Sequence, residues 1–303
     1  MNLVFLGLLA AFFILQVTVL GGSVVLGASP LALYLLIELL SQSPRKASAT
    51  KMKVIRVSPQ RMAERMDAFG RRYSKWSSGD VTEERVVVGG LEAVLVTPPE
   101  ASARRGTAVV CTHPWAPLGG DMDNNVPMTL AHAFARCGMI ALRFNFRGVG
   151  NSKGCCTWRG TGERADAKAV CRWLVETQGI TQIVLCGYSY GSMISNSVAG
   201  EIDQVVGYIS LSSPFPCYWG LSLFNCGNFL KWSQTSKPKL LICGSGDQFT
   251  SSKKFQRFSA SFPEPKKTVL VSGMDHFYFG YELGAASLSM EWLLETGIIA
   301  NVQ

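Results

Sequence analysis

The sequence predicts an α/β domain with a mostly parallel central sheet, preceded by an N-terminal membrane segment. The domain is predicted because short apolar runs of strand length alternate with helix-compatible stretches from about residue 81 onward. The membrane segment is predicted because Glu38 is the only charged residue between Leu3 and Leu40. With 48% hydrophobic and 17% charged residues, the 303-residue chain is neither a disordered nor a fibrous protein.

The apolar stretch from Leu3 to Leu40 is 38 residues long, and about 20 residues span a bilayer. Gly21 and Gly22 divide it. One tilted helix, a span with an interfacial segment and a tight hairpin therefore all fit, and a single anchor is favoured. A cleaved signal peptide fits poorly, because the stretch is too long and no Lys or Arg precedes it. We expect residues 1–42 to be a membrane anchor, either single-pass or hairpin.

Residues 43–80 are expected to form a basic juxtamembrane linker with a docking helix. The net charge of the chain is +8, and ten basic residues against two acidic ones lie between Arg45 and Lys75. Basic residues beside a span favour the cytosolic side, which predicts a cytosolic domain at a membrane, and they can also contact anionic headgroups. Helical spacing is shown by three apolar residues of this segment: Met62, Met66 and Phe69.

Nucleic acid is not expected as a partner. The basic residues follow an apolar stretch, whereas a nucleic-acid-binding protein spreads them over a folded face with aromatic residues among them.

The elements of residues 81–303 follow from periodicity. Two alternating runs, 84–88 and 91–97, flank Gly89-Gly90 and indicate a β-hairpin. Further strands are expected at 108–112, 140–146, 182–186, 205–211, 240–243 and 268–271. Helices are expected at 128–136, 163–176, 193–199, 252–259 and 285–294. Because ligands of such sheets bind at the carboxyl ends of the strands, residues that directly follow strands are the candidates for a site.

Two Gly-x-Ser-x-Gly motifs occur, centred on Ser152 and Ser189. The motif forms a nucleophile elbow only between a buried strand and a helix. Ser189 follows the apolar run 183–186 and precedes a helix-compatible stretch, whereas a Gly- and Cys-containing loop follows Ser152. Ser189 is therefore the candidate nucleophile, and Ser152 is interpreted as a turn residue.

A serine nucleophile needs a general base, usually histidine. The chain has three, and only His276 follows Ser189 in the order Ser, acid, His. His132 lies in an amphipathic stretch, and His113 ends a strand, where it can order a loop. His276 comes just after the last expected strand and is therefore the candidate base.

The acid that orients the base should lie between Ser189 and His276, at the end of a strand. Asp247 does so, after the strand 240–243. It is favoured over three alternatives, of which one precedes a strand, one lies in a Pro-flanked turn and one is adjacent to His276: Asp203, Glu264 and Asp275.

Two backbone amides are expected to form an oxyanion hole. One belongs to Tyr190, the residue after the nucleophile. The other comes from the loop after strand 108–112, where Pro114 has no N–H and Trp115 is the next donor.

From about Glu84 to Leu294 the chain resembles the α/β-hydrolases. It is most similar to a bacterial-type subgroup of small hydrolases related to dienelactone hydrolases and prolyl-type serine peptidases. The motifs that carry the resemblance, besides the Ser189 elbow, are His113-Pro114, Gly119–Asn124, Leu142–Ser152, Gly162-Glu163, Asp166-Ala167 and Met274–Phe277. The resemblance implies an α/β-hydrolase fold, a Ser189–Asp247–His276 triad and a structural turn at Ser152.

These features predict a membrane-anchored serine hydrolase that cleaves small-molecule or lipid esters or thioesters. An aromatic-rich stretch near 213–232 is expected to form a short cap, either lining the site or simply packing on the sheet. No spacing typical of a metal site is present, and neither a metal nor a cofactor is expected. A serine peptidase of the same fold and a non-catalytic membrane-tethered scaffold are the alternatives.

Overall fold

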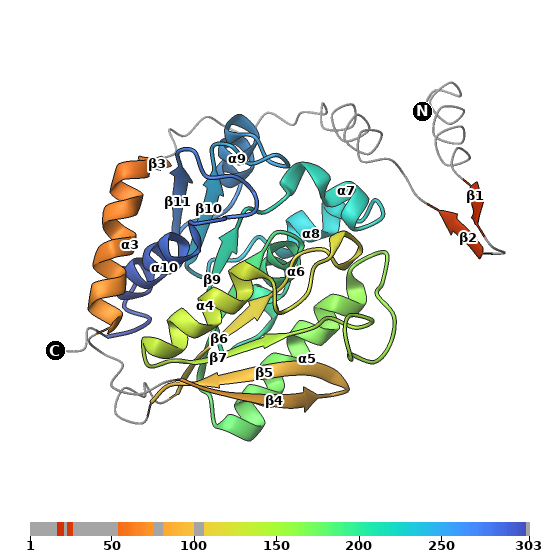
Figure 1. Ribbon diagram of the computed structural model, residues 1–303, viewed down its shortest axis with the longest axis horizontal. Helices are drawn as coiled ribbons and strands as arrows, with labels where there is room; N and C mark the ends of the chain where they lie inside the picture. The colour runs from red at the N-terminus through yellow and green to blue at the C-terminus, as the bar shows by residue number, and fades with distance from the viewer. Residues whose placement is uncertain (1–16, 21–22, 27–53, 75–80, 100–105, 301–303) are drawn as a thin grey trace. The chain divides into compact units, whose positions relative to one another are not determined.

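The computed structural model describes residues 17–20, 23–26, 54–74, 81–99 and 106–300, in two units, Met1–Lys46 and Ala47–Gln303 (Figure 1). In the first unit, β1 (Val17–Leu20) pairs antiparallel with β2 (Ser23–Leu26). Strands therefore stand where a membrane helix was expected, consistent with β-branched residues on both sides of a Gly-Gly pair. The rest of the expected anchor lies outside the described residues. Among those described, no helix has the length and hydropathy needed to cross a membrane.

The second unit is built on a nine-stranded sheet with the order β3-β11-β10-β9-β8-β6-β7-β5-β4 (Figure 1). Its strands are β3 (Val54–Val57), β4 (Thr82–Val88), β5 (Leu91–Thr97), β6 (Thr107–Thr112), β7 (Ile140–Phe144), β8 (Gln182–Tyr188), β9 (Val205–Leu211), β10 (Lys239–Gly244) and β11 (Lys266–Val271). Only the pairs β4–β5 and β5–β7 are antiparallel. The mostly parallel sheet predicted from the sequence is confirmed.

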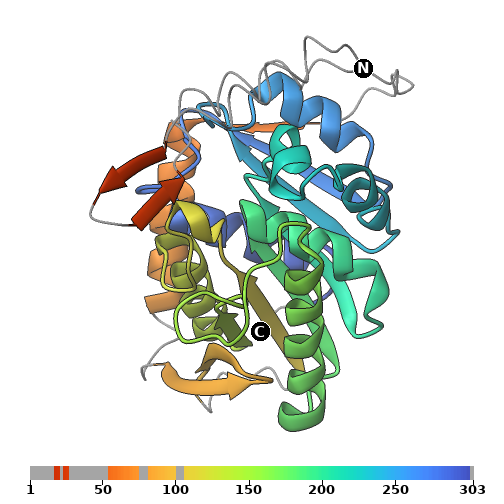
Figure 2. The same cartoon turned by 90° about the vertical axis from the view of Figure 1, so that its right-hand side faces the viewer.

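Helices cover both faces of this sheet. They are α3 (Pro59–Ser74), α4 (Asn125–Arg136), α5 (Thr161–Gln178), α6 (Tyr190–Val198), α7 (Tyr218–Leu221), α8 (Cys226–Trp232), α9 (Ser252–Ala260) and α10 (Glu282–Glu295). Helices α3, α4 and α10 contribute to one buried apolar cluster and α5, α6, α8 and α9 to the other, and the turned view shows α3 and α5 on opposite sides of the sheet (Figure 2). Alternate residues of each strand point to opposite faces, so Val109 and Val110 of β6 belong to different clusters.

Residues 54–74 of the segment expected as a linker are part of this domain. Strand β3 extends the sheet by pairing parallel with β11, from Val54 opposite Thr268 to Val57 opposite Val271. Helix α3 packs its apolar face, with the fully buried Met62, against α10. The sheet domain therefore begins at β3, before the boundary at residue 81 that the sequence suggested.

We expect Met62→Ala to lower the free energy of unfolding by about 2–5 kcal/mol, because it leaves a cavity between α3 and α10. The contact is close: a Cβ added at Gly284 of α10 would lie 2.4 Å from the Met62 sulfur. Gln60→Ala, an exposed position of the same helix, should change that free energy by at most about 0.5 kcal/mol. Denaturant titration of both variants measures the difference, and equal effects would contradict the packing of α3 into the domain.

Candidate active site

Ser189 lies in a tight turn between β8 and α6. Its φ of 53° is uncommon for a residue with a side chain. The flanking glycines make the turn possible: a Cβ on Gly187 would lie 2.5 Å from the Ser192 Cα, and one on Gly191 would lie 2.5 Å from the Thr112 carbonyl oxygen. The backbone around Ser189 is therefore packed so closely that only glycine fits at positions 187 and 191 of the motif.

Ser189, His276 and Asp247 lie in one hydrogen-bonded chain. The Ser189 Oγ is 2.9 Å from the His276 Nε2, and the His276 Nδ1 is 2.9 Å from the Asp247 Oδ2. With Nδ1–H donating to the carboxylate, Nε2 is left to accept the proton of the serine hydroxyl. All three residues are buried, and the three loops that carry them follow β8, β10 and β11.

The environment of Asp247 keeps its carboxylate ionised. Burial by itself raises the pKa of Asp247. The hydrogen bond and charge of His276, together with donors from Ser212 and the Thr250 amide, outweigh burial and hold that pKa below its ordinary value. The Oδ1 atom accepts hydrogen bonds from the Phe249 and Thr250 amides, each at 2.9 Å. The carboxylate is thus fixed opposite the imidazole.

Two further groups that the sequence did not single out hold the His276 backbone. The Gln248 Oε1 accepts a hydrogen bond from the His276 amide at 3.0 Å. The Tyr188 hydroxyl donates to the His276 carbonyl oxygen at 2.8 Å. Tyr188 belongs to the Gly-x-Ser-x-Gly motif, and Gln248 follows the candidate acid directly. The sequence signal that could have identified these two residues is their position next to Ser189 and Asp247.

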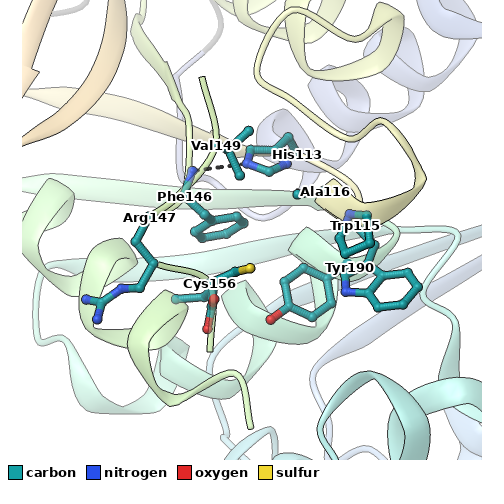
Figure 3. A pocket seen from close by; sticks show the side chains of 10 residues that line it. His113, Trp115, Ala116, Phe146, Arg147, Val149, Cys156 and Tyr190 are labelled. Atoms are coloured by element: carbon teal, nitrogen blue, oxygen red, sulfur yellow. Dashed lines mark hydrogen bonds between the residues drawn. The ribbon is translucent and has the colours of Figure 1, made fainter. Parts of the chain in front are cut away.

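The two residues whose amides are the expected oxyanion donors both line one small cleft. Tyr190 is the first residue of α6, so its N–H has no acceptor within its own helix. Trp115 lies in the loop after β6, and both side chains line the cleft (Figure 3). The free space is about 20 Å³, room for about one water molecule. The cleft is lined by His113, Trp115, Ala116, Pro117, Phe146, Arg147, Val149, Cys156, Glu163 and Tyr190.

His113 orders the loop that carries Trp115. Its Nδ1–H donates to the Pro114 carbonyl oxygen at 2.6 Å. Its Nε2 accepts from the Phe146 amide at 3.0 Å, as Figure 3 shows. The neutral imidazole thereby joins the loop after β6 to the residues that follow β7. Burial lowers the pKa of His113 to about 4, against a weaker opposing effect of the Pro114 carbonyl.

We expect acid to destabilise the folded protein through His113. Its pKa is about 4 in the folded protein and about 6.5 in an unfolded chain. Between these pH values the unfolded chain binds more protons at His113, so the contribution of His113 to the free energy of unfolding falls as the pH falls and levels off below pH 4. The total contribution is about 3 kcal/mol. Denaturant titrations across this pH range measure the slope. His113→Gln should flatten it, and an unchanged slope would contradict the assignment.

The competing residues have other roles. The Ser152 hydroxyl donates to the Asn145 carbonyl oxygen at 2.7 Å and accepts from the Glu92 amide at 2.9 Å, so it stabilises a buried turn. His132 pairs with Glu83 at 2.6 Å on the outer side of α4. Neither side chain has a hydrogen bond to Ser189, His276 or Asp247 in the described structure.

The described residues contain no cluster of His, Cys, Asp and Glu that could hold a metal ion. All nine cysteines are free, and Cys155 and Cys156 are exposed.

The aromatic stretch near 213–232 contributes mainly to packing. Phe215, Tyr218 and Phe229 are buried in the cluster on the α6 side of the sheet. Phe215 stacks on Phe258 with ring centroids 5.4 Å apart. Phe224 is 66% exposed. The sequence left two interpretations open for this stretch, lining the site or packing on the sheet. The three buried rings pack on the sheet.

The parallel sheet, the strained serine turn and the hydrogen-bonded chain define a serine hydrolase of the α/β-hydrolase fold. The model of the X-Pro dipeptidyl-peptidase (S15) family matches residues 90–273. The chain belongs to this family. The resemblance to α/β-hydrolases drawn from the sequence is confirmed.

Solved structures agree with the fold, and curated sequences are similar to this chain. A serine hydrolase homologue from Coxiella burnetii is 29% identical, with a TM-score of 0.60 over 70% of this chain and 97% of that chain. A serine hydrolase without lid from Xanthomonas campestris is 21% identical, with a TM-score of 0.62 over 74% of this chain and 97% of that chain. An uncharacterized protein of Rickettsia prowazekii is 23% identical, covering 59% of this chain and 75% of that protein.

Proposed function

We propose that the protein is a membrane-anchored serine hydrolase that cleaves ester or thioester bonds through an acyl-enzyme. The observation that carries the proposal is the hydrogen-bonded chain from Ser189 through His276 to Asp247, at 2.9 Å for each step. The Ser189 Oγ attacks the carbonyl carbon while the His276 Nε2 takes the hydroxyl proton. The amides of Tyr190 and Trp115 donate hydrogen bonds to the oxyanion.

The same residues complete the reaction. Protonated His276 gives its proton to the leaving alkoxide or thiolate as the tetrahedral intermediate collapses, and the acyl group stays on Ser189. His276 then deprotonates a water molecule, which attacks the acyl-enzyme and releases the acid. Asp247 stays ionised throughout and stabilises the imidazolium.

A serine peptidase is the second candidate, because the family carries the name of X-Pro dipeptidyl-peptidases. An enzyme that removes a dipeptide from a free N-terminus has to bind the substrate ammonium with an anionic or acceptor group. Glu163 is the acidic residue among those that line the cleft, and its two carboxylate oxygens already accept hydrogen bonds from the amide and hydroxyl of Thr157. Glu163 is therefore not free to bind a substrate ammonium, which is why the peptidase is the second candidate and not the first.

The anchor in this proposal is the apolar stretch from Leu3 to Leu40, and the basic residues after it favour a catalytic domain on the cytosolic face. The support comes from the sequence pattern, since most of this stretch lies outside the described residues.

Substrate preference tests the proposal. The full chain in detergent micelles is assayed with p-nitrophenyl esters and with an X-Pro p-nitroanilide, with Ser189→Ala as the blank. We expect kcat/KM for the esters to exceed that for the anilide by at least tenfold, or about 1.4 kcal/mol in transition-state stabilisation. The opposite order would favour the peptidase. Absence of both activities in a folded protein would favour a non-catalytic scaffold.

A further inference from the structure

The catalytic edge of the sheet carries most of the large apolar side chains that are exposed in the described part of the chain. Loops after four parallel strands (β6, β7, β9 and β11), together with the helix ends next to them, supply these side chains. Such loops meet at one edge of a sheet. We call this set the apolar rim: Leu118, Met128, Trp158, Leu223, Phe224, Phe277, Phe279 and Leu283. The other two exposed large apolar residues, Ile55 and Val87, lie on the edge strands β3 and β4.

The apolar rim is continuous with the candidate active site. The Phe277 ring lies edge-on to the His276 ring, with centroids 5.8 Å apart. Phe279 stacks on Phe277 at 6.1 Å and is 71% exposed. The Asn125 side chain donates to the Phe277 carbonyl oxygen at 2.9 Å and ties this loop to the start of α4. An apolar surface thus begins beside the candidate base and extends into solvent.

Single exposed apolar residues are ordinary on protein surfaces, whereas a group gathered around a site marks an interaction surface. The rim combines Trp, Phe and Leu, and the exposed Lys153 and Arg159 lie on either side of Trp158 in the sequence. Aromatic and aliphatic residues with neighbouring basic residues are the composition that inserts into the headgroup region of a bilayer.

The length of chain before the domain favours a bilayer over a protein partner. Thirteen residues, 41–53, separate the apolar stretch Leu3–Leu40 from β3, and when extended they span at most about 45 Å. A domain tethered at this distance from a membrane segment meets the bilayer at a high effective concentration. Weak insertion by a few side chains then suffices for docking.

We infer that the apolar rim docks on a lipid bilayer and opens the active site toward it, so that the enzyme takes acyl esters directly from the membrane. This inference rests on the proposed function for the membrane anchor and for the identity of the substrate. The docking itself is independent of catalysis, and the two parts can be tested separately.

The binding test uses the full chain carrying Ser189→Ala, reconstituted into phosphatidylcholine and phosphatidylserine vesicles with brominated acyl chains. Trp158 is 76% exposed and reports on the rim. We expect brominated lipid to quench tryptophan fluorescence, with a clear part of the quenching lost in Trp158→Phe. Phe279→Asp should reduce the quenching that Trp158 accounts for at least twofold. Val87→Asp is the matched control, because Val87 is 73% exposed but lies on β4, which six strands of the sheet separate from β11, the strand that precedes Phe279; it should change nothing.

The activity test uses the same vesicles with Ser189 intact. Phe279→Asp should slow hydrolysis of a long-chain ester in the bilayer at least fivefold and leave hydrolysis of a short water-soluble ester unchanged, whereas Val87→Asp should affect neither. Quenching that is the same with and without Trp158 would overturn the docking, even if both esters are cleaved. Quenching without hydrolysis of any ester would leave the docking standing and overturn the proposed function. Trp158 shielded from aqueous iodide but not quenched by brominated lipid would mean that a protein segment covers the rim, which also overturns the inference.

Discussion

Ser189→Ala should abolish both ester hydrolysis and labelling by a fluorophosphonate probe. The variant removes the atom that attacks the carbonyl carbon, and no other hydroxyl lies at hydrogen-bonding distance from the His276 Nε2 in the described structure. We expect kcat to fall by at least about 10⁴-fold, with the remaining rate supplied by the oxyanion donors and by substrate binding. Steady-state kinetics and in-gel fluorescence of the full chain measure the two effects.

Ser152→Ala is the matched control, because Ser152 is the centre of the second Gly-x-Ser-x-Gly motif. Its hydroxyl is engaged by the Asn145 carbonyl and the Glu92 amide, so its removal can cost stability but should leave labelling intact. Loss of labelling in a folded Ser152→Ala protein, with labelling kept in Ser189→Ala, would show that the wrong serine had been assigned.

Asp247→Asn should lower kcat by about 10³–10⁴-fold with little change in KM. The carboxylate accepts the Nδ1–H of His276 at 2.9 Å. An amide in its place can donate instead, which favours the imidazole tautomer with its proton on Nε2, and it cannot stabilise the imidazolium. Asp203→Asn serves as the control, since Asp203 also lies between Ser189 and His276 in the sequence but precedes β9. A kcat within tenfold of wild type for Asp247→Asn would contradict its role as the orienting acid.

The central sheet could be predicted because the physical signals in this part of the chain agree with one another. Buried parallel strands are mostly apolar, as in β6 and β10, and each of these two is followed by a turn and an amphipathic stretch. Chain order then singled out Ser189, Asp247 and His276, since each directly follows a strand of this sheet. The structure places the Ser189 and Asp247 side chains each within hydrogen-bonding distance of the His276 ring.

The N-terminal edge of the domain was not predictable by the same reasoning. Strand β3 has only four residues and lies within a basic segment, so its charge pattern indicates a linker. What makes it a strand is the free edge of β11, and tertiary pairing of this kind leaves no local signal. The role of the expected cap could not be decided from the sequence for a similar reason. Phe215 and Phe229 are equally compatible with a substrate wall and with packing until their neighbours are known.

The surroundings of the acid were also beyond the sequence. The Ser212 hydroxyl and the Thr250 amide help to hold the pKa of Asp247 low. The amides of Phe249 and Thr250 donate hydrogen bonds that fix its carboxylate. Ser212 lies 35 positions before Asp247 in the chain. It meets the carboxylate because β9 and β10 are neighbours in the sheet, a relation that only the fold reveals.

Peptide mass spectrometry of the full chain after reaction with a fluorophosphonate tests the central assignment most directly. Trypsin cleaves after Lys153 and Arg172, so Ser152 and Ser189 fall in different peptides. We expect one adduct, on the peptide that contains Ser189, and its loss in His276→Ala. An adduct on the Ser152 peptide, or none on a folded wild-type protein, would contradict the assignment of Ser189 as the nucleophile of a serine hydrolase.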